Sequence, residues 1–399
     1  MSAATEGGAN ADAPLAAQRS HDAACDDPGS LAAWLRLALT EGVGAGNGRR
    51  LLAAFGLPGA VFQAPRQVLE ALAGPRLAAA LRQPSSAALR ASVEAALDWA
   101  RQPGHAIATL ADTHYPQALL TIPDPPLLLY VDGNPALLQA EALAVVGSRN
   151  ATAQGLAHAE RFSEELSRAG LAIVSGLALG IDAAAHTGGL RGPGSTVAVI
   201  GTGIDIAYPS RNRALAQRIV EDGCIVSEYP LGMPPLAANF PRRNRLISGL
   251  ARAVLVIEAA AQSGSLITAR MAAEQGRDVF AIPGSIHSPL AKGCHQLIRQ
   301  GAKLVETTQD VLEEMPRFAR RAALPAQVFP GAADESEMRA DDDAATSIVI
   351  QAMGHDPLGA DLLASRCGLD AARLAELLLG LELEGRIEVL PGARYRRLG

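Results

Sequence analysis

Three arginines crowded into four positions are the part of this sequence best suited to chemistry. The stretch FPRRNR, residues 240–245, holds Arg242, Arg243, Asn244 and Arg245 behind a Phe-Pro step. Guanidinium groups packed this densely repel one another unless an anion lies between them, and their planar donor forks match phosphate oxygens. A solvated helix start with outward-pointing charges is the alternative interpretation. We expect an anion site, because an apolar run typical of a buried strand begins soon afterwards at Ala253, and α/β sheets bind ligands at strand ends.

The middle of the chain alternates apolar runs with helical stretches, which predicts the sheet that would position these arginines. The runs are LAVVGS, LAIVSG, STVAVIG, CIVSEY, AVLVIEA, DVFAIPG and KLVE, between residues 143 and 306. Continuous Val/Ile/Leu strands that alternate with helices predict a parallel sheet covered on both faces. With right-handed crossovers this is a doubly wound, Rossmann-like α/β domain.

Small-residue turns follow most of these predicted strands. They occupy residues 146–149, 174–182, 200–205, 262–270 and 282–285. Glycine lets an anion or a backbone approach closely, and the helix N-terminus that follows each turn carries unpaired N–H groups. We therefore expect several of these turns to line one edge of the sheet, although each alone is equally consistent with a tight turn.

Motifs of nucleotide-dependent enzymes are missing from the turns. No turn completes GxGxxG with an acidic residue about 20 positions later, and neither a P-loop nor a GxSxG elbow occurs. Asp182 and His186 stand at i and i+4, where they would either do acid–base work or brace a helix. Glu228 and Glu258 follow strands and would pair with the arginines structurally. The sequence predicts no metal site, no cofactor and no catalytic residue.

Flanking segments differ in composition from the middle of the chain. An Ala/Gly/Asp-rich start lacks large apolar groups, and the helical part after it contains GVGAG, which resembles a helix-hairpin-helix turn able to hold a DNA phosphate. A Pro-rich connector with short β-like runs leads into the sheet, and the last 53 residues follow the order of a winged helix. We expect a disordered tail over 1–29, a small helical (SAM/helix-hairpin-helix-like) domain over 30–104, an extended Rossmann-like domain over 105–311, a linker over 312–346 and a winged helix over 347–399.

Composition limits the possible partners. The net charge is −6, yet the segment between Val145 and Asp310 holds 16 Lys and Arg against 13 Asp and Glu. A mildly positive middle within an acidic chain allows a local anion site without a generally basic surface. The four cysteines are scattered, no apolar run reaches the roughly 20 residues of a membrane span, and the N-terminus lacks signal-peptide features. We expect a cytoplasmic protein.

The ordered set of motifs resembles one family. VGSR, SGLALGIDAAAH, VAVIGTGIDIAYPSRNR, SEYP, FPRRNRLISGL, IEAAAQSGSLITAR and GRDVFAIPGS are similar, in order and spacing, to the DNA-processing protein A (DprA, also called Smf) family, from about Pro116 to Asp310. The resemblance implies a protein of natural transformation that binds incoming single-stranded DNA, forms a homodimer and loads the RecA recombinase. Either DNA or a protein is a possible partner of the winged helix.

Carried over by position, the resemblance implies a set of DNA contacts. Phosphates would meet the turn amides, hydroxyls and arginines, while one base would stack on Phe240. Some relatives carry a lysine ahead of the Phe-Pro step, where this chain has Ala237 and Ala238. The implied single-stranded DNA contacts are Gly147, Ser148, Arg149, Ser175, Gly176, Gly201, Gly203, Arg211, Arg213, Phe240, Arg242, Arg243, Asn244, Arg245, Ser263, Gly264 and Ser265.

Two other functions compete with DNA binding. The first is a Rossmann-like nucleotide phosphoribohydrolase, an enzyme class with a PGGxGT turn and a catalytic glutamate. Here the corresponding turn reads IPGSIHSP with no glutamate following, which disfavours that class. The second is an interaction scaffold whose arginines meet a protein partner. It predicts no affinity for oligonucleotides at low salt.

Overall fold

The structure, a computed structural model, describes residues 28–315, 346, 349, 358–369, 371–390 and 394–397. The chain divides into two compact units, residues 1–324 and 325–399. Residues 1–27 of the predicted tail and most of the predicted linker over 312–346 lie outside the described residues. Pro28 and Gly29, which were expected in the tail, instead begin the first described helix.

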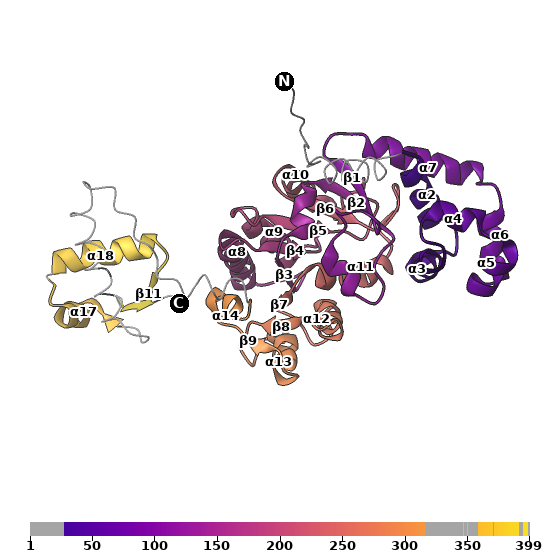
Figure 1. Ribbon diagram of the computed structural model, residues 1–399. Helices are drawn as coiled ribbons and strands as arrows, with labels where there is room; N and C mark the ends of the chain where they lie inside the picture. Colours follow the sequence, from indigo (N-terminus) through magenta and orange to yellow (C-terminus); the bar gives the residue numbers. More distant parts are fainter. Residues whose placement is uncertain are drawn as a thin grey trace, which may run out of the picture. The chain divides into compact units, whose positions relative to one another are not determined.

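Six helices lie between residues 28 and 100 of the first unit, in the range where helical periodicity predicted them (Figure 1). Leu37, Val43, Leu51, Val61 and Leu69 are fully or almost fully buried in their common core. The first two helices are joined by the GVG turn, in which both glycines have a positive φ. Their bounds are α2 Pro28–Leu39, α3 Gly44–Phe55, α4 Pro58–Gln63, α5 Arg66–Ala73, α6 Pro75–Arg82 and α7 Ala87–Ala100.

A nine-stranded sheet with the order β1-β2-β6-β5-β4-β3-β7-β8-β9 follows. From β6 to β9 all neighbours pair in parallel, as the seven apolar runs predicted. The Pro-rich connector is a correction to the prediction, because it supplies β1 and β2, which extend the sheet in antiparallel pairing. The strands are β1 His105–Thr109, β2 Leu128–Gly133, β3 Ala142–Gly147, β4 Ala172–Ser175, β5 Thr196–Val199, β6 Cys224–Ser227, β7 Ala253–Ile257, β8 Asp278–Ala281 and β9 Lys303–Leu304.

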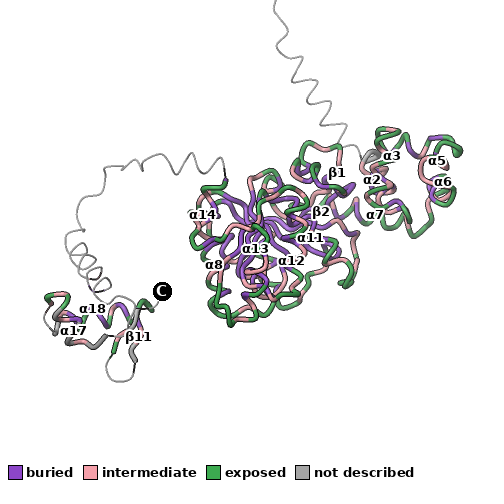
Figure 2. Tube along the Cα trace, turned by 90° about the horizontal axis from the view of Figure 1, so that it is seen from below, coloured by how far each residue is buried: buried purple, intermediate pink, exposed green. Residues whose placement is uncertain are grey.

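Helices cover both faces of the parallel part of the sheet (Figures 1 and 2). Along β3, Ala144 and Val146 face one hydrophobic core, while Leu143 and Val145 face the other. This alternation with a period of two is what a strand buried on both faces requires. The helices are α8 Ala153–Arg168, α9 Ile181–Gly189, α10 Arg213–Asp222, α11 Asn239–Leu250, α12 Ser265–Glu274, α13 Lys292–Arg299 and α14 Thr308–Glu313, with 3₁₀ turns η1 Gln117–Thr121, η2 Pro135–Gln139, η3 Ser210–Asn212 and η4 Pro289–Ala291.

The helical part is packed directly on the α/β part. A Cβ at Gly48 would lie 2.9 Å from the Cδ2 atom of Leu127 and closer still to its Cδ1, so a larger residue here would require the Leu127 side chain to move. Arg49 on the same helix donates from Nη2 to the carbonyl oxygen of Pro123 at 2.6 Å. Farther along, the ring of Trp99 in α7 stacks on His105 in β1.

The second unit has the helix and strand order predicted for a winged helix. Leu363, Leu374, Leu378, Leu381 and Ile387 are buried in its core. The expected first helix, SIVIQAMG, lies outside the described residues apart from Val349. The elements are β10 Leu358–Gly359, α17 Ala360–Cys367, α18 Ala371–Leu383, β11 Ile387–Leu390 and β12 Arg394–Arg397, with strand order β10-β12-β11. None of the helices in the described ranges is long and apolar enough to cross a membrane.

Candidate nucleic-acid interface

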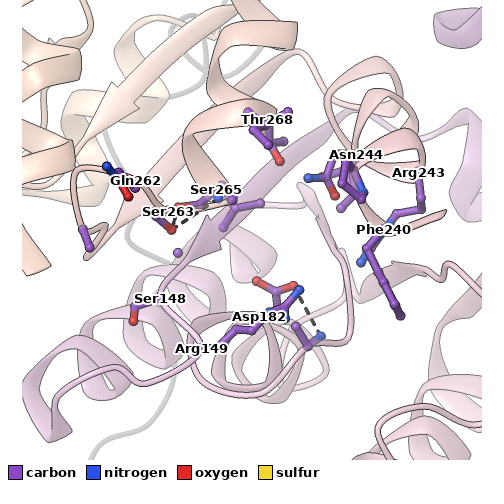
Figure 3. A pocket seen from close by; sticks show the side chains of 18 of the residues that line it. Ser148, Arg149, Asp182, Phe240, Arg243, Asn244, Gln262, Ser263, Ser265 and Thr268 are labelled. Carbon is purple, nitrogen blue, oxygen red and sulfur yellow. Dashed lines mark hydrogen bonds between the residues drawn. The ribbon is translucent and has the colours of Figure 1, made fainter. Parts of the chain in front are cut away.

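A cleft of about 720 Å³, called the main cleft below, lies at the carboxyl ends of β3 and β7. These two strands are neighbours, with Gly147 opposite Ile257, and the chain leaves them toward opposite edges of the sheet. Doubly wound sheets bind ligands at this change of direction. The residues that line the cleft come from the end of β3, from the turns after β3, β4, β5, β6 and β7, and from α9, α11 and α12 (Figure 3).

The turn after β3 forms the floor of the main cleft. Ser148 donates its backbone N–H to the carbonyl oxygen of Glu258 at 2.7 Å, which ties the turn to the end of β7. A Cβ at Gly147 would collide with the carbonyl of Ile257, so the close approach of the two strand ends requires glycine here. Arg149 is exposed and makes no ion pair within 4.0 Å in the part of the chain that the structure describes.

The start of α12 forms one side of the cleft with two serines. The hydroxyls of Ser263 and Ser265 lie 2.7 Å apart, and Ser263 Oγ also accepts from the backbone N–H of Ser265 at 3.3 Å. Figure 3 shows both serines across the cleft from Phe240, Arg243 and Asn244. Hydroxyls and first-turn N–H groups at a helix start are donors suited to an anion.

Arg243 is a buried cation in the wall of the cleft. Its residue is 4% exposed, Nη1 donates to the carbonyl oxygen of Val199, and Nε has no hydrogen-bond partner among the described residues. No carboxylate in those residues lies within ion-pair distance of it. Burial lowers the pKa of Arg243 to about 10, Asp182 opposes that shift and Arg149 adds to it. The protein thus keeps a guanidinium out of water without pairing it directly, which leaves it available to an anionic ligand.

Asp182 and His186 brace the start of α9. Asp182 accepts from the backbone N–H groups of Gly176 and Ala178, at 3.2 and 3.4 Å. His186 Nε2 accepts from the N–H of Leu177, and its Nδ1 lies 2.7 Å from the Thr196 hydroxyl. Burial lowers the pKa of His186 to about 3, with Arg243 acting in the same direction, so the ring is neutral. Of the two interpretations left open by the sequence, the bracing role fits these contacts.

Gly176, which was expected to contact DNA directly, instead adjoins the buried side chain of Arg243. A Cβ at this position would overlap Nη1 of Arg243 and come within 2.7 Å of Oδ2 of Asp182. The glycine therefore makes room for the buried arginine and does not itself line the cleft. Its contribution to anion binding would be indirect.

Arg245 lies away from the main cleft, which corrects the expectation that all three arginines face one ligand. Its side chain is 6% exposed and pairs with Glu228 at 2.5 Å and with Asp124 at 3.0 Å. Two residues along an α-helix correspond to a rotation of about 200°, so Arg243 and Arg245 point to opposite sides of α11. The predicted pairing of Glu228 with an arginine is confirmed, whereas Glu258 instead accepts from the N–H and hydroxyl of Thr152 at the start of α8.

The remaining predicted residues divide according to whether they line the cleft. Ser175 is buried and donates to the carbonyl of Val145, and Arg242 is exposed on a smaller groove beside the start of α3. The main cleft brings together Gly147, Ser148, Arg149, Phe240, Arg243, Asn244, Ser263, Gly264 and Ser265. It does not include Ser175, Gly176, Gly201, Gly203, Arg211, Arg213, Arg242 or Arg245.

A second aromatic ring at the rim was missed by the sequence reasoning. Tyr208, in the turn between β5 and η3, lines the cleft, and its ring centroid lies 5.6 Å from that of Phe240. The motif YPSRNR contained this tyrosine, but only its arginines were interpreted. Asp182, Gln262 and Thr268 also line the cleft without having been expected there.

The described residues contain no group of three or more His, Cys, Asp or Glu side chains placed to hold a metal ion. The IPGS turn after β8 lines a separate cavity of about 200 Å³ next to Glu258 and Cys294, away from the main cleft. The turn that would mark a phosphoribohydrolase is therefore not part of the cationic site.

Comparison with known proteins identifies the family. The family model described as DNA recombination-mediator protein A matches residues 106–316, which is more than half of the chain. This chain belongs to the DprA/Smf family. A second model of that family, the DprA winged helix domain, matches residues 333–393. The family resemblance and the fold class predicted from the sequence are confirmed, and the phosphoribohydrolase alternative is not favoured.

Individual DprA/Smf relatives cover most of the chain. Protein Smf of Escherichia coli (strain K12) is 42% identical over 311 residues, 77% of this chain and 81% of that protein. DNA processing protein DprA of Streptococcus pneumoniae is 52% identical over 206 residues, 52% of this chain and 73% of that protein. The X-ray structure of DprA from Streptococcus pneumoniae aligns with a TM-score of 0.61 at 41% identity, over 70% of this chain and 95% of that one.

Proposed function

We propose that the main cleft binds single-stranded DNA and that the protein acts as a DNA-binding accessory factor without a catalytic step. The observation that carries the proposal is Arg243, a buried guanidinium with no directly paired carboxylate among the described residues. Arg149, the serine hydroxyls and the start of α12 surround the same space. Together they offer charge-assisted donors to phosphate oxygens.

The rim of the cleft favours an unpaired strand. Phe240 is partly exposed beside the cationic wall, so a phosphate held by Arg243 would place its nucleotide next to an aromatic face. Stacking of a base on such a ring contributes about 1–3 kcal/mol and does not depend on base identity. In a duplex the base faces are already stacked on one another and are not available to the ring.

Membership of the DprA/Smf family extends the proposal to natural transformation in the cytoplasm. We infer that a homodimer protects incoming single-stranded DNA and loads RecA onto it. Two copies of a weak site on one strand raise the overall affinity through effective concentration.

The test is an equilibrium binding measurement by fluorescence anisotropy with single-stranded and duplex oligonucleotides across a salt series. We expect single strands to bind more tightly and log affinity to fall linearly with log salt. Arg243→Gln removes the buried charge and should abolish binding of the single-stranded oligonucleotide. Arg218→Gln, at an exposed position on α10, serves as the control and should bind as the unaltered protein does. Unchanged binding by Arg243→Gln, or no binding by the unaltered protein at low salt, would refute the proposal.

A further inference from the structure

Two aromatic rings, not one, lie on the rim of the main cleft. Tyr208 comes from the turn after β5 and Phe240 from the first turn of α11, and their ring planes are tilted by 36°. Tyr208 is 46% exposed, and a large aromatic side chain exposed beside a cationic wall indicates a ligand with both apolar and anionic parts. Leu236, on the loop that leads into α11, is similarly exposed at 48% but does not line the cleft.

Phe240 is fixed in place by the end of β5. A Cβ at Gly201 would lie 3.0 Å from Cδ1 and 3.3 Å from Cε1 of the Phe240 ring, so glycine allows the ring to lie against the backbone there. Tyr208 then packs on a ring that is already positioned. The hydroxyl group of Tyr208 makes no hydrogen bond to any residue in the described ranges. Apart from the contact of its ring with Phe240, the side chain therefore has no internal role there.

The spacing of the rings decides how bases would meet them. Inserting a base between two rings requires two stacking distances of about 3.4 Å each, whereas the centroids are 5.6 Å apart. A base therefore cannot enter between Tyr208 and Phe240. Because the planes are tilted, the two rings also cannot both lie flat on one base, so each offers a face to a different base.

We infer that Tyr208 is a second base-stacking residue, so that the cleft takes two successive bases of one strand and thereby selects unpaired DNA. The inference rests on the proposed function and deepens it. The arginines attract any phosphate backbone, single or double stranded. The ring pair adds a contribution that only accessible base faces can provide.

The experiment compares Tyr208→Leu with the unaltered protein on two probes: a short oligothymidylate and an oligonucleotide of equal length whose residues are abasic. Leucine keeps an apolar contact with Phe240 but has no aromatic face. We expect Tyr208→Leu to lose about 5- to 150-fold in affinity for the oligothymidylate, the range that corresponds to one stacked base. Its affinity for the abasic probe should not change. Tyr208→Trp should restore binding, and Leu236→Ala, the exposed apolar neighbour, should bind as the unaltered protein does.

Three outcomes would overturn the inference. They are unchanged affinity of Tyr208→Leu for oligothymidylate, an equal loss on the abasic probe, and a loss by Leu236→Ala as large as that by Tyr208→Leu. Failure of the proposed function is distinguishable, since in that case the unaltered protein binds neither probe. If the unaltered protein binds both probes and Arg243→Gln does not, while Tyr208→Leu is normal, only the second stacking residue is refuted.

Discussion

Substituting methionine for each of the two buried arginines of α11 should separate folding from DNA binding. In Arg245→Met, Glu228 loses its partner and is left as a buried carboxylate, with its side chain 8% exposed. Breaking a buried pair in this way costs about 3–5 kcal/mol. We expect that loss of unfolding free energy, with little change in DNA affinity for the folded protein.

Arg243→Met should have the opposite pattern. A pKa lowered from 12.5 to about 10 means that burial disfavours the charged form by roughly 3 kcal/mol. The substitution removes that cost and also removes the hydrogen bond to the Val199 carbonyl, which contributes about 1.5–3 kcal/mol. It also leaves the buried carboxyl of Asp182 without the arginine that favours its charged form. Because these losses oppose the gain from removing a buried charge, we expect a smaller loss of stability than in Arg245→Met, while binding of single-stranded DNA is lost.

Urea denaturation followed by tryptophan fluorescence measures the first effect. Trp34 and Trp99, the two tryptophans of the chain, are both buried in the first unit, so the signal reports on that unit. Anisotropy of a labelled oligonucleotide measures the second effect below the unfolding transition. The double variant Arg245→Met/Glu228→Gln should recover most of the lost stability, because it replaces the unpaired charge with a neutral amide.

One result would refute this division of roles. If Arg245→Met were as stable as the unaltered protein and yet failed to bind DNA, Arg245 would belong to the ligand site and not to the internal ion pair. Equal destabilisation by both substitutions would likewise show that Arg243 is needed for folding. The comparison is matched, since both residues lie on the same helix and receive the same replacement.

Three further predictions test other parts of the site. Arg149→Gln should weaken binding and reduce the slope of log affinity against log salt by about 0.7, the value of one phosphate contact on a single strand. Gly176→Ala should reduce DNA affinity without altering the charge of the protein, because its methyl group displaces Arg243. A salt series on the Arg149→Gln and Gly176→Ala variants distinguishes loss of a charge from displacement of one. Between pH 6.5 and about 3 the unfolded chain protonates His186 and the folded chain does not. Stability should therefore fall by up to roughly 5 kcal/mol as the pH drops through this window, and urea titrations of His186→Gln should show a flatter dependence.

The parallel part of the sheet was predictable because each of its strands is a continuous apolar run between glycine turns. Strands β1 and β2 were visible only as short β-like runs in the Pro-rich connector. Their antiparallel pairing and their place in the sheet were not predicted, because pairing with a distant strand leaves no local pattern. The helical part and the order of the winged-helix elements followed from periodicity. The domain boundaries stay a prediction.

The location of the candidate site at one edge of the sheet could be predicted, but the full set of side chains that line it could not. The small-residue turns indicated one binding edge, and the family resemblance implied that Ser148 and Ser263 would both lie in the site, where the structure places them. Spacing within FPRRNR did not show that Arg243 and Arg245 lie on opposite sides of a helix, since the start of that helix at Asn239 was unknown. The role of Tyr208 could not be predicted, because its turn lies 32 positions before Phe240 in the sequence and only the fold brings the two rings together.

The contrast between a buried arginine and its exposed neighbours has a kinetic consequence. Arg149 and Arg242 lie in water, where they act on a passing polyanion over a Debye length of about 8–10 Å. Arg243 acts only after a strand has entered the cleft, and its side chain is already held by Val199. Added salt should therefore slow the capture of DNA through the exposed arginines, whereas Arg243 should govern how long a captured strand stays bound.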